Sequence, residues 1–272
     1  MLDRGDLDFV IVATPHDTHA SITLDALERG IPVLKEKPLA LSVREGQRIV
    51  ERSQETGIPV MVATQRRFDH LFSVFESALT SIGEPTLIEG RYMCCRADAQ
   101  AGWRGSPHSA GGGCLMDMGY HLIDTIIRFF GLPDQLMAGT GITSDDVVED
   151  QAMVFFNYGS ATGTLITSRR YPFHGKQECL RVLGCHGAIE IRNGRFCQLS
   201  TSGAKLESVR GTDLTKARSV RMIESFSRVL AGDLPNPSDA EAHLDHLRFL
   251  EAAYLSAKTG RPYSPERIED QP

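Results

Sequence analysis

The chain has 272 residues, which is enough for one large domain or two smaller ones around a sizeable core. Its 41% hydrophobic and 24% charged residues are typical of a soluble globular protein, and no apolar run approaches the roughly 18 residues of a membrane-spanning helix. The formal net charge of −6 argues against nucleic acid or an anionic membrane as a main partner.

The amino terminus and the cysteines indicate the compartment. Asp3, Asp6 and Asp8 make the start acidic, unlike the basic start of a signal peptide. None of the six cysteines forms a C-x-x-C pair, and the adjacent Cys94 and Cys95 suit neither zinc nor an easy disulfide. We therefore expect reduced thiols, a cytoplasmic location and no bound metal.

The first quarter of the chain alternates between strand and helix patterns. Apolar runs predict strands, and helical spacing with a capping box at Ser42 and Glu45 predicts helices. The strands are expected at 8–13, 31–34 and 58–63, and the helices at 16–29 and 42–57. This order predicts an α/β parallel sheet with right-handed crossovers. Ligands bind beyond the carboxyl ends of such strands, where three polar clusters lie: Thr14-Pro15-His16, Glu36-Lys37-Pro38 and Gln65-Arg66-Arg67.

The rest of the chain changes to an α+β pattern. Strands are expected near 86–92, 136–140, 152–158, 162–168, 180–183 and 188–191. Turn residues at 157–160 and 192–195 make this part mostly antiparallel. Helices are expected near 71–81, 220–231 and 239–259, the last behind a second capping box at Ser238 and Glu241. We place a truncated Rossmann-like domain at 1–68 and a domain with a large open sheet at 69–272, the last helix being free to pack back on the first domain.

A central helix at residues 114–130 follows three consecutive glycines and is apolar on almost every side. Its polar residues form one narrow stripe of Asp117, His121, Asp124 and Arg128, spaced four, three and four apart. A solvated face would normally be wider and rich in Lys and Glu. We favour the alternative, a histidine that acts as a general acid or base and is oriented by a carboxylate.

Four motifs in this order resemble the glucose–fructose oxidoreductase and inositol dehydrogenase family (Gfo/Idh/MocA), over nearly all of the chain. They are Ala13-Thr14-Pro15 with His19, Glu36-Lys37-Pro38, Trp103-Arg104, and Gly111-Gly112-Gly113 leading to Asp117-x-Gly119-x-His121-x-x-Asp124. The departure is that no G-x-G-x-x-G fingerprint precedes Asp8, so the pyrophosphate-binding segment is absent from this chain. We therefore expect weak dinucleotide affinity, and an exposed sheet edge at Phe9–Val12.

The resemblance implies a dehydrogenase that moves a hydride between NAD or NADP and a sugar, cyclitol or related polyol. It implies a homo-oligomer through the open sheet and a cis Lys37–Pro38 bond. By resemblance the catalytic residues are Lys37, Asp117 and His121, which with Asp124 also face the substrate. The implied cofactor contacts are Ala13, Thr14, Pro15, His16, His19, Glu36, Gln65, Trp103 and Arg104.

The chemistry of alcohol oxidation fits these residue types. His121 can take the hydroxyl proton, with Asp117 orienting its ring and favouring the protonated form, and Lys37 can stabilise the developing alkoxide. Less specific interpretations remain open for other residues. His16 and His19 can merely flank a helix, and Asp124 can be a structural carboxylate, with Arg128 as its partner or at the solvated end of the stripe. Arg66 and Arg67 can meet phosphate or be solvated, and we favour solvation. His243 and His246 are expected on the surface of the last helix.

Two rival functions remain. The first is a binding or scaffold protein that keeps the sugar cleft without redox chemistry. The second is metal-dependent hydrolysis through Asp117, His121 and Asp124, which the sequence disfavours because all three lie on one helix with no second ligand cluster.

Overall fold

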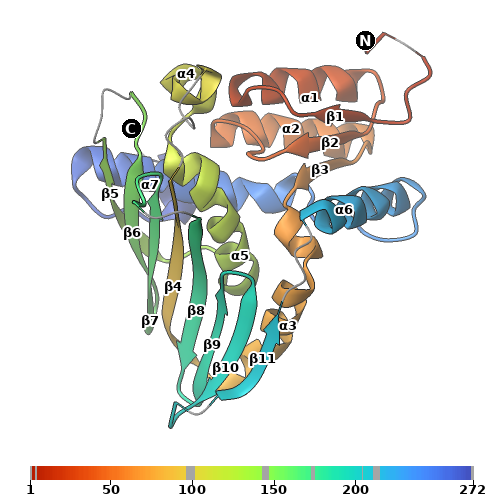
Figure 1. Ribbon diagram of the computed structural model, residues 1–272. Coiled ribbons are helices and arrows are strands. Elements are labelled where there is room, and N and C mark those ends of the chain that lie inside the picture. Colours follow the sequence, from red (N-terminus) through yellow and green to blue (C-terminus); the bar gives the residue numbers. More distant parts are fainter. Residues whose placement is uncertain are drawn as a thin grey trace.

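The computed structural model describes residues 2–3, 5–95, 102–142, 147–172, 175–203, 205–210 and 215–270. Two sheets organise these residues, a small parallel one near the amino terminus and a large one that fills the lower part of the molecule in Figure 1. This is the predicted combination of a Rossmann-like α/β sheet and a larger, mostly antiparallel sheet. Within the described residues, no helix combines the length and apolar character needed to cross a lipid bilayer.

The small sheet has the strand order β1-β2-β3, formed by Val10–Val12, Val33–Glu36 and Val60–Ala63, all parallel. The helices α1 (His19–Glu28) and α2 (Val43–Thr56) cross between these strands. The Ser42 hydroxyl accepts a hydrogen bond from the Glu45 backbone N–H, and the Glu45 carboxylate accepts one from Leu41, so the predicted capping box is confirmed.

The two faces of the small sheet are covered differently. Val10 and Val12 face the main core with α1 and α2, whereas Leu34 and Met61 pack with helix α6 (Thr215–Leu230) on the other face. Strand β1 is the edge of the described sheet, and its Ile11 side chain is 56% exposed. The prediction of an exposed edge strand is therefore confirmed for the described residues.

The large sheet has eight strands in the order β11-β10-β9-β8-β4-β7-β6-β5. In chain order the strands are β4 Pro85–Cys94, β5 Gln135–Gly141, β6 Gln151–Tyr158, β7 Ala161–Ser168, β8 Lys176–Gly184, β9 Gly187–Arg192, β10 Arg195–Ser200 and β11 Lys205–Arg210. Among the described pairings of this sheet, only β4 with β7 is parallel. The sequence did not predict β10 and β11, because neither segment alternates regularly between apolar and polar residues.

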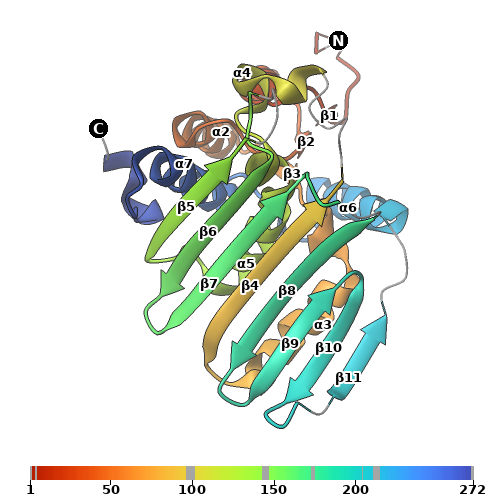
Figure 2. The ribbon, with the colours of Figure 1, turned by 60° about the vertical axis from the view of Figure 1, so that its left-hand side comes forward.

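One face of the large sheet is covered and the other is open (Figure 2). Helices α3 (His70–Ala78), α5 (Tyr120–Phe130) and α7 (Leu244–Thr259) cover the inner face. On the outer face, Met153 and Phe155 of β6 are about half exposed, since they alternate with buried neighbours.

Helix α7 contacts both parts of the molecule. It packs on β5, and its Glu251 carboxylate accepts a hydrogen bond of 2.7 Å from the backbone N–H of Val43 at the start of α2. The surface positions expected for His243 and His246 are wrong, because the side chains are 0% and 1% exposed where α7 meets α5. Ser238 does not form the second capping box either, since its hydroxyl donates to the Val62 carbonyl and Asp239 caps this segment instead.

Candidate functional site

Lys37 lies in a tight turn at the carboxyl end of β2. The Lys37–Pro38 peptide bond is cis, as the family resemblance implied. Two buried side chains hold this turn from behind. The Nζ of Lys35 donates to the Leu39 carbonyl, and the two ring nitrogens of His19 lie 3.0 Å from the carbonyl oxygens of Pro38 and Thr14, of which the neutral ring donates to one. The chain direction after β2 is thereby fixed, and the Lys37 side chain is 8% exposed.

The Lys37 amine contacts Asp117. Its Nζ donates to the Asp117 backbone carbonyl at 2.7 Å and to carboxylate Oδ1 at 2.6 Å. The other carboxylate oxygen lies 3.3 Å from the guanidinium of Arg169, at the end of β7. Burial alone would raise the pKa of Asp117, but Lys37 and Arg169 outweigh it and hold that pKa well below its usual range. Asp117 is therefore a permanent anion between two cations.

Asp117 lies on a π-helical turn, η5 (Leu115–Gly119), that leads directly into α5. The predicted helix at 114–130 is therefore two segments, and π-helical turns of this kind are frequent at functional sites. Gly113 allows the close approach at its start, since a Cβ there would lie 1.8 Å from the Glu149 carbonyl oxygen. The Glu149 carboxylate accepts hydrogen bonds from the backbone N–H groups of Gly113 at 2.6 Å and Leu115 at 3.0 Å. Sequence reasoning missed Glu149, whose role depends on a contact between distant segments.

His121 lies one turn after Asp117 and is partly exposed. No described side chain hydrogen-bonds to its ring, and Asp117 uses its carboxylate on Lys37 and Arg169 instead. Burial, followed by the charges of Arg66 and Lys37, lowers the pKa of His121 to about 3. Asp117 raises this pKa, as expected, but the opposing effects of burial, Arg66 and Lys37 are larger. His121 is a neutral imidazole at physiological pH, which is the form that accepts a proton.

Further charged residues lie around the Tyr92 ring on β4, which is next to His121. The two ring centroids are 6.3 Å apart, and the Arg66 guanidinium and the Lys176 amine lie 5.4 and 5.6 Å from the Tyr92 centroid. Both cations also pair with Glu178 of β8, at 2.5 and 2.8 Å. The solvated position expected for Arg66 is wrong, and no pattern in the sequence indicated Tyr92, Lys176 or Glu178 as neighbours of His121.

The ends of the parallel strands gather the residues implied as cofactor contacts. Ala13, Thr14 and Pro15 follow β1 directly, and the Gln65 amide after β3 donates to the Glu36 carboxylate at 3.2 Å. From the second half of the chain, the Trp103 ring lies 4.6 Å from the His16 ring and beneath the Arg104 guanidinium. Exposed backbone, an amide and an indole at this edge suit the nicotinamide end of a dinucleotide. His19 is enclosed in the core, so here it supports the turns rather than facing a ligand.

Asp124 lies apart from this group. Its carboxylate is enclosed by Arg67, whose Nη2 is 2.6 Å from Oδ1, and by His246, whose Nε2 is 3.0 Å from the same oxygen. With 2% of the residue exposed, the carboxylate is unavailable to a substrate in this structure. Arg128, the suggested partner, pairs with Glu76 instead, and the solvated position expected for Arg67 is wrong.

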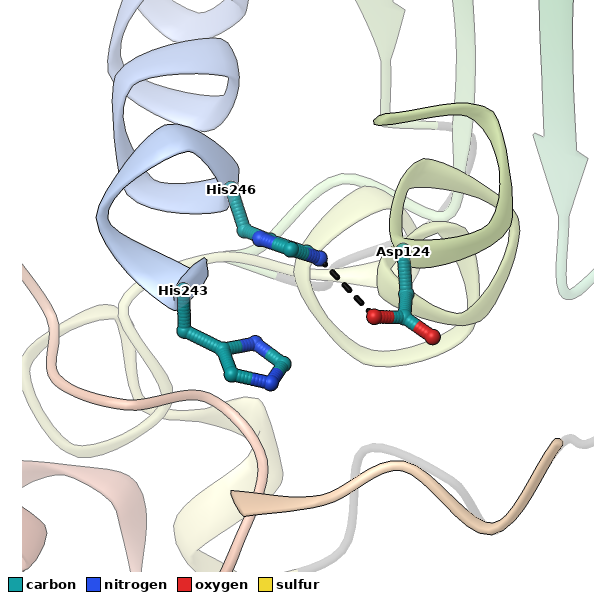
Figure 3. A group of neighbouring side chains, drawn as sticks. All are labelled: Asp124, His243 and His246. Carbon is teal, nitrogen blue, oxygen red and sulfur yellow. Dashed lines mark hydrogen bonds and ion pairs between the residues drawn. The ribbon is translucent and has the colours of Figure 1, made fainter. Parts of the chain in front are cut away.

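Asp124, His243 and His246 lie close enough to be considered as metal ligands (Figure 3). Their hydrogen bonds argue against it. Ser238 donates to the Val62 carbonyl and so accepts from Nε2 of His243, which leaves Nδ1 of that ring to accept the Tyr120 hydroxyl. The Asp124 carboxylate is already neutralised by the Arg67 guanidinium. The cluster is therefore a hydrogen-bonded support that joins α5, α7 and the segment after β3.

Comparisons with known proteins agree with this geometry. Residues 1–64 match the family model described as "Oxidoreductase family, NAD-binding Rossmann fold", and residues 79–190 match "GFO/IDH/MocA C-terminal domain". The scyllo-inositol 2-dehydrogenase (NADP(+)) IolW of Bacillus subtilis is 26% identical, over 94% of this chain and 78% of its own length. The D-xylose 1-dehydrogenase (NADP(+)) 2 of Haloferax volcanii is 28% identical, over 96% of this chain and 81% of its own.

Solved structures show the same fold. The inositol dehydrogenase homolog of Azotobacter vinelandii, complexed with NAD+, superposes with a TM-score of 0.82 at 20% identity, over 97% of this chain and 80% of that chain. Together with the two family matches, this confirms the resemblance inferred from the motifs. The chain belongs to the Gfo/Idh/MocA family of oxidoreductases.

Proposed function

We propose that this protein transfers a hydride between NAD or NADP and a hydroxyl-bearing carbon of a sugar, cyclitol or related polyol. The observation that carries the proposal is the contact of Lys37 with Asp117, which joins the end of a Rossmann-type strand to the helix that bears His121. Three curated relatives that match most of the chain are dehydrogenases of inositol and xylose by name, which supports the same reaction class.

The proton chemistry follows from the charge states. The neutral His121 ring accepts the hydroxyl proton of the substrate as the hydride leaves the same carbon, and the alcohol becomes a carbonyl. The Lys37 ammonium has three N–H groups. Two of them donate to Asp117, one to its backbone carbonyl and one to its carboxylate. One N–H remains for the substrate oxygen, whose developing negative charge it stabilises. Asp117 orients the ammonium toward the substrate oxygen.

The dinucleotide supplies the hydride acceptor or donor. Thr14, Pro15, Glu36 and Gln65 would hold its nicotinamide end, with Trp103 and Arg104 closing the same edge. The match of residues 1–64 to an NAD-binding Rossmann model supports this choice of cofactor.

The alternative is a sugar-binding or scaffold protein without redox activity. Calorimetry separates the two functions. Binding of a polyol without any binding of NADH or NADPH would support the scaffold, and binding of both ligands would support the enzyme.

The direct test is reduction of NAD or NADP by a panel of sugars, alditols and cyclitols, followed by ultraviolet absorbance. We expect turnover that Lys37→Met lowers by about 100-fold or more, since one charge-stabilising donor contributes about 2.7–4 kcal/mol. The matched control is Lys258→Met at an exposed position near the end of α7. Equal activity of both variants would contradict the assignment of Lys37.

We also propose a homo-oligomer formed through the open sheet. Met137, Met153 and Phe155 present apolar surface on its outer face, with exposures of 47%, 54% and 50%. Phe155→Glu is expected to lower the molar mass measured by light scattering, whereas Val220→Glu, on the exposed side of α6, should not. A wild-type monomer at high concentration would contradict the proposal.

We also propose a cytoplasmic location. All six cysteines are free, which supports a reducing compartment.

A further inference from the structure

The charges around His121 do not balance. Asp117 is shared by Lys37 and Arg169, and Glu178 is shared by Arg66 and Lys176. Each carboxylate therefore neutralises one of its two cations, and these six side chains together carry an excess of two positive charges. The whole chain has a formal net charge of −6, so this local excess has the opposite sign to the protein as a whole.

The neighbouring acid does not remove the excess. Glu36 lies beside Lys37, and burial raises the pKa of its carboxyl. Counted as fully ionised, it still leaves an excess of one positive charge over these seven side chains. Asp124 lies behind the site and is already paired with Arg67.

Two of the cations are poorly screened by water. Arg66 and Arg169 are 8% and 3% exposed. Nη1 of Arg66, and Nε and Nη1 of Arg169, are buried without a hydrogen-bond partner among the described residues. Buried donors of this kind interact more strongly with a nearby negative charge than donors in water do.

We propose that the preferred substrate of this site is an anionic sugar derivative, a polyol that carries a carboxylate or phosphate group, rather than a neutral sugar. The inference rests on the proposed dehydrogenase function and adds the substrate class. The reacting hydroxyl lies between Lys37 and His121, and the anionic group lies toward Arg66, Lys176 and Tyr92.

The first test compares sugars that differ only at the terminal carbon. D-Glucose, D-glucuronate and the corresponding glucose phosphate form one set, D-galactose and D-galacturonate a second, and D-glucitol and D-gluconate a third. We expect kcat/KM to be at least about tenfold higher for an anionic member than for its neutral counterpart. The advantage should shrink as salt is raised, because salt screens the interaction of the substrate with partly exposed cations. Comparison of kcat/KM for D-glucuronate with that for the glucose phosphate shows whether the site prefers a carboxylate or a phosphate group.

The second test removes one cation at the rim. The Lys176 side chain is 52% exposed, and Glu178 keeps Arg66 as its partner when Lys176 is lost. In Lys176→Met we expect KM for the anionic substrate to rise about threefold to fivefold, as for loss of one charge near the ligand at intermediate dielectric. KM for the neutral counterpart should stay within about twofold. Lys258→Met makes the same charge change far along α7 and should alter neither value.

The outcomes separate this inference from the proposed function. Turnover that favours neutral sugars, or an equal effect of Lys176→Met on both members of a set, overturns the substrate class and leaves the dehydrogenase intact. Calorimetric binding of the sugar acids with no reduction of NAD or NADP supports the substrate class and overturns the dehydrogenase. Absence of both binding and turnover across all three sets counts against both.

Discussion

The Lys37 amine lies 2.6 Å from the Asp117 carboxylate, although the two residues are 80 positions apart in the chain. Lys37 extends from the turn after β2 of the small sheet, and Asp117 from the π-helical turn before α5. The contact therefore joins a group at the edge of the Rossmann-type sheet to the helix that carries His121. The position of the Lys37 amine therefore depends on Asp117.

Replacing Asp117 by Asn removes the charge and keeps the shape. The Lys37 ammonium then loses its anionic partner, and a buried cation beside Arg169 repels its neighbour. We expect kcat/KM for polyol oxidation to fall by about 100-fold, comparable to the loss of one charge-stabilising group. Asp25→Asn, at an exposed position on α1, is the control and should remain within about twofold of wild type. Full activity of the Asp117 variant would refute the role of this pair.

The pH dependence of oxidation should lack a histidine step. The pKa of His121 is lowered to about 3, so the ring is neutral and able to accept a proton throughout the range from about pH 5 to pH 8. We expect no acid limb in kcat/KM against pH within that range. An acid limb with its midpoint near the ordinary value of about 6.5 would show that a different histidine, or a charged His121, controls the reaction.

Protein stability should fall in mild acid because His19 is buried in its neutral form. Burial lowers its pKa to about 4, below the value of about 6.5 that an unfolded chain shows. Below about pH 6.5 the unfolded state therefore binds a proton that the folded state does not, and stability decreases as the pH falls toward 4. His19→Gln should lower the urea midpoint at about pH 7.5, and the gap to wild type should narrow at about pH 5. The exposed His108→Gln should track wild type at both values.

Replacing Asp124 should lower the free energy of unfolding strongly, because the partners of its carboxylate lie in the core, away from Lys37 and His121. Asp124→Asn leaves the Arg67 guanidinium without a charged partner in the core, and removal of one member of such a pair costs about 3–5 kcal/mol. We expect a loss of this size in the free energy of unfolding from urea titrations. Glu76→Gln breaks the exposed pair with Arg128 and should cost less than about 1 kcal/mol. Similar losses in both variants would contradict this interpretation.

Gly113 is the most sterically constrained of the three central glycines. A Cβ at this position would lie 1.8 Å from the Glu149 carbonyl oxygen, so Gly113→Ala must displace the start of η5 and with it Asp117. We expect loss of folded protein or a melting temperature lowered by about 4 °C or more, as for roughly 2 kcal/mol or more in a domain of this size. Gly139→Ala in β5 meets no atom within 4 Å and is the matched control.

Local patterns predicted the elements and the ends of the parallel strands. Apolar runs located β1, β2 and β3, and the order of strand and helix placed Thr14, Lys37 and Gln65 at one edge. The spacing of Asp117 and His121 predicted one face of a helix, and the structure keeps them together despite the π-helical turn. These features depend on neighbours in the sequence, which is why the sequence reveals them.

What the sequence could not predict are contacts between distant segments. In the Arg66–Glu178 and Arg67–Asp124 pairs, two arginines expected in solvent are buried and half-buried, respectively, and His246 is a core residue because α7 packs on α5. The Asp117 carboxylate looked like a partner for His121, but Arg169, from the end of β7, takes one of its oxygens. The neutral charge state of the ring follows mainly from its burial, and then from the charges of Arg66 and Lys37.

The parallel pairing of β4 with β7 has a consequence for how the chain reaches its native state. Strands β5 to β7 and strands β8 to β11 are each joined to their sequence neighbours by hairpins, so either meander can assemble early. Strand β4 precedes both and is inserted between β7 and β8. Closing that long loop is entropically costly, so we expect insertion of β4 to limit the refolding rate. Substitutions in β4 should then slow refolding, while those in the β10–β11 hairpin should mainly accelerate unfolding.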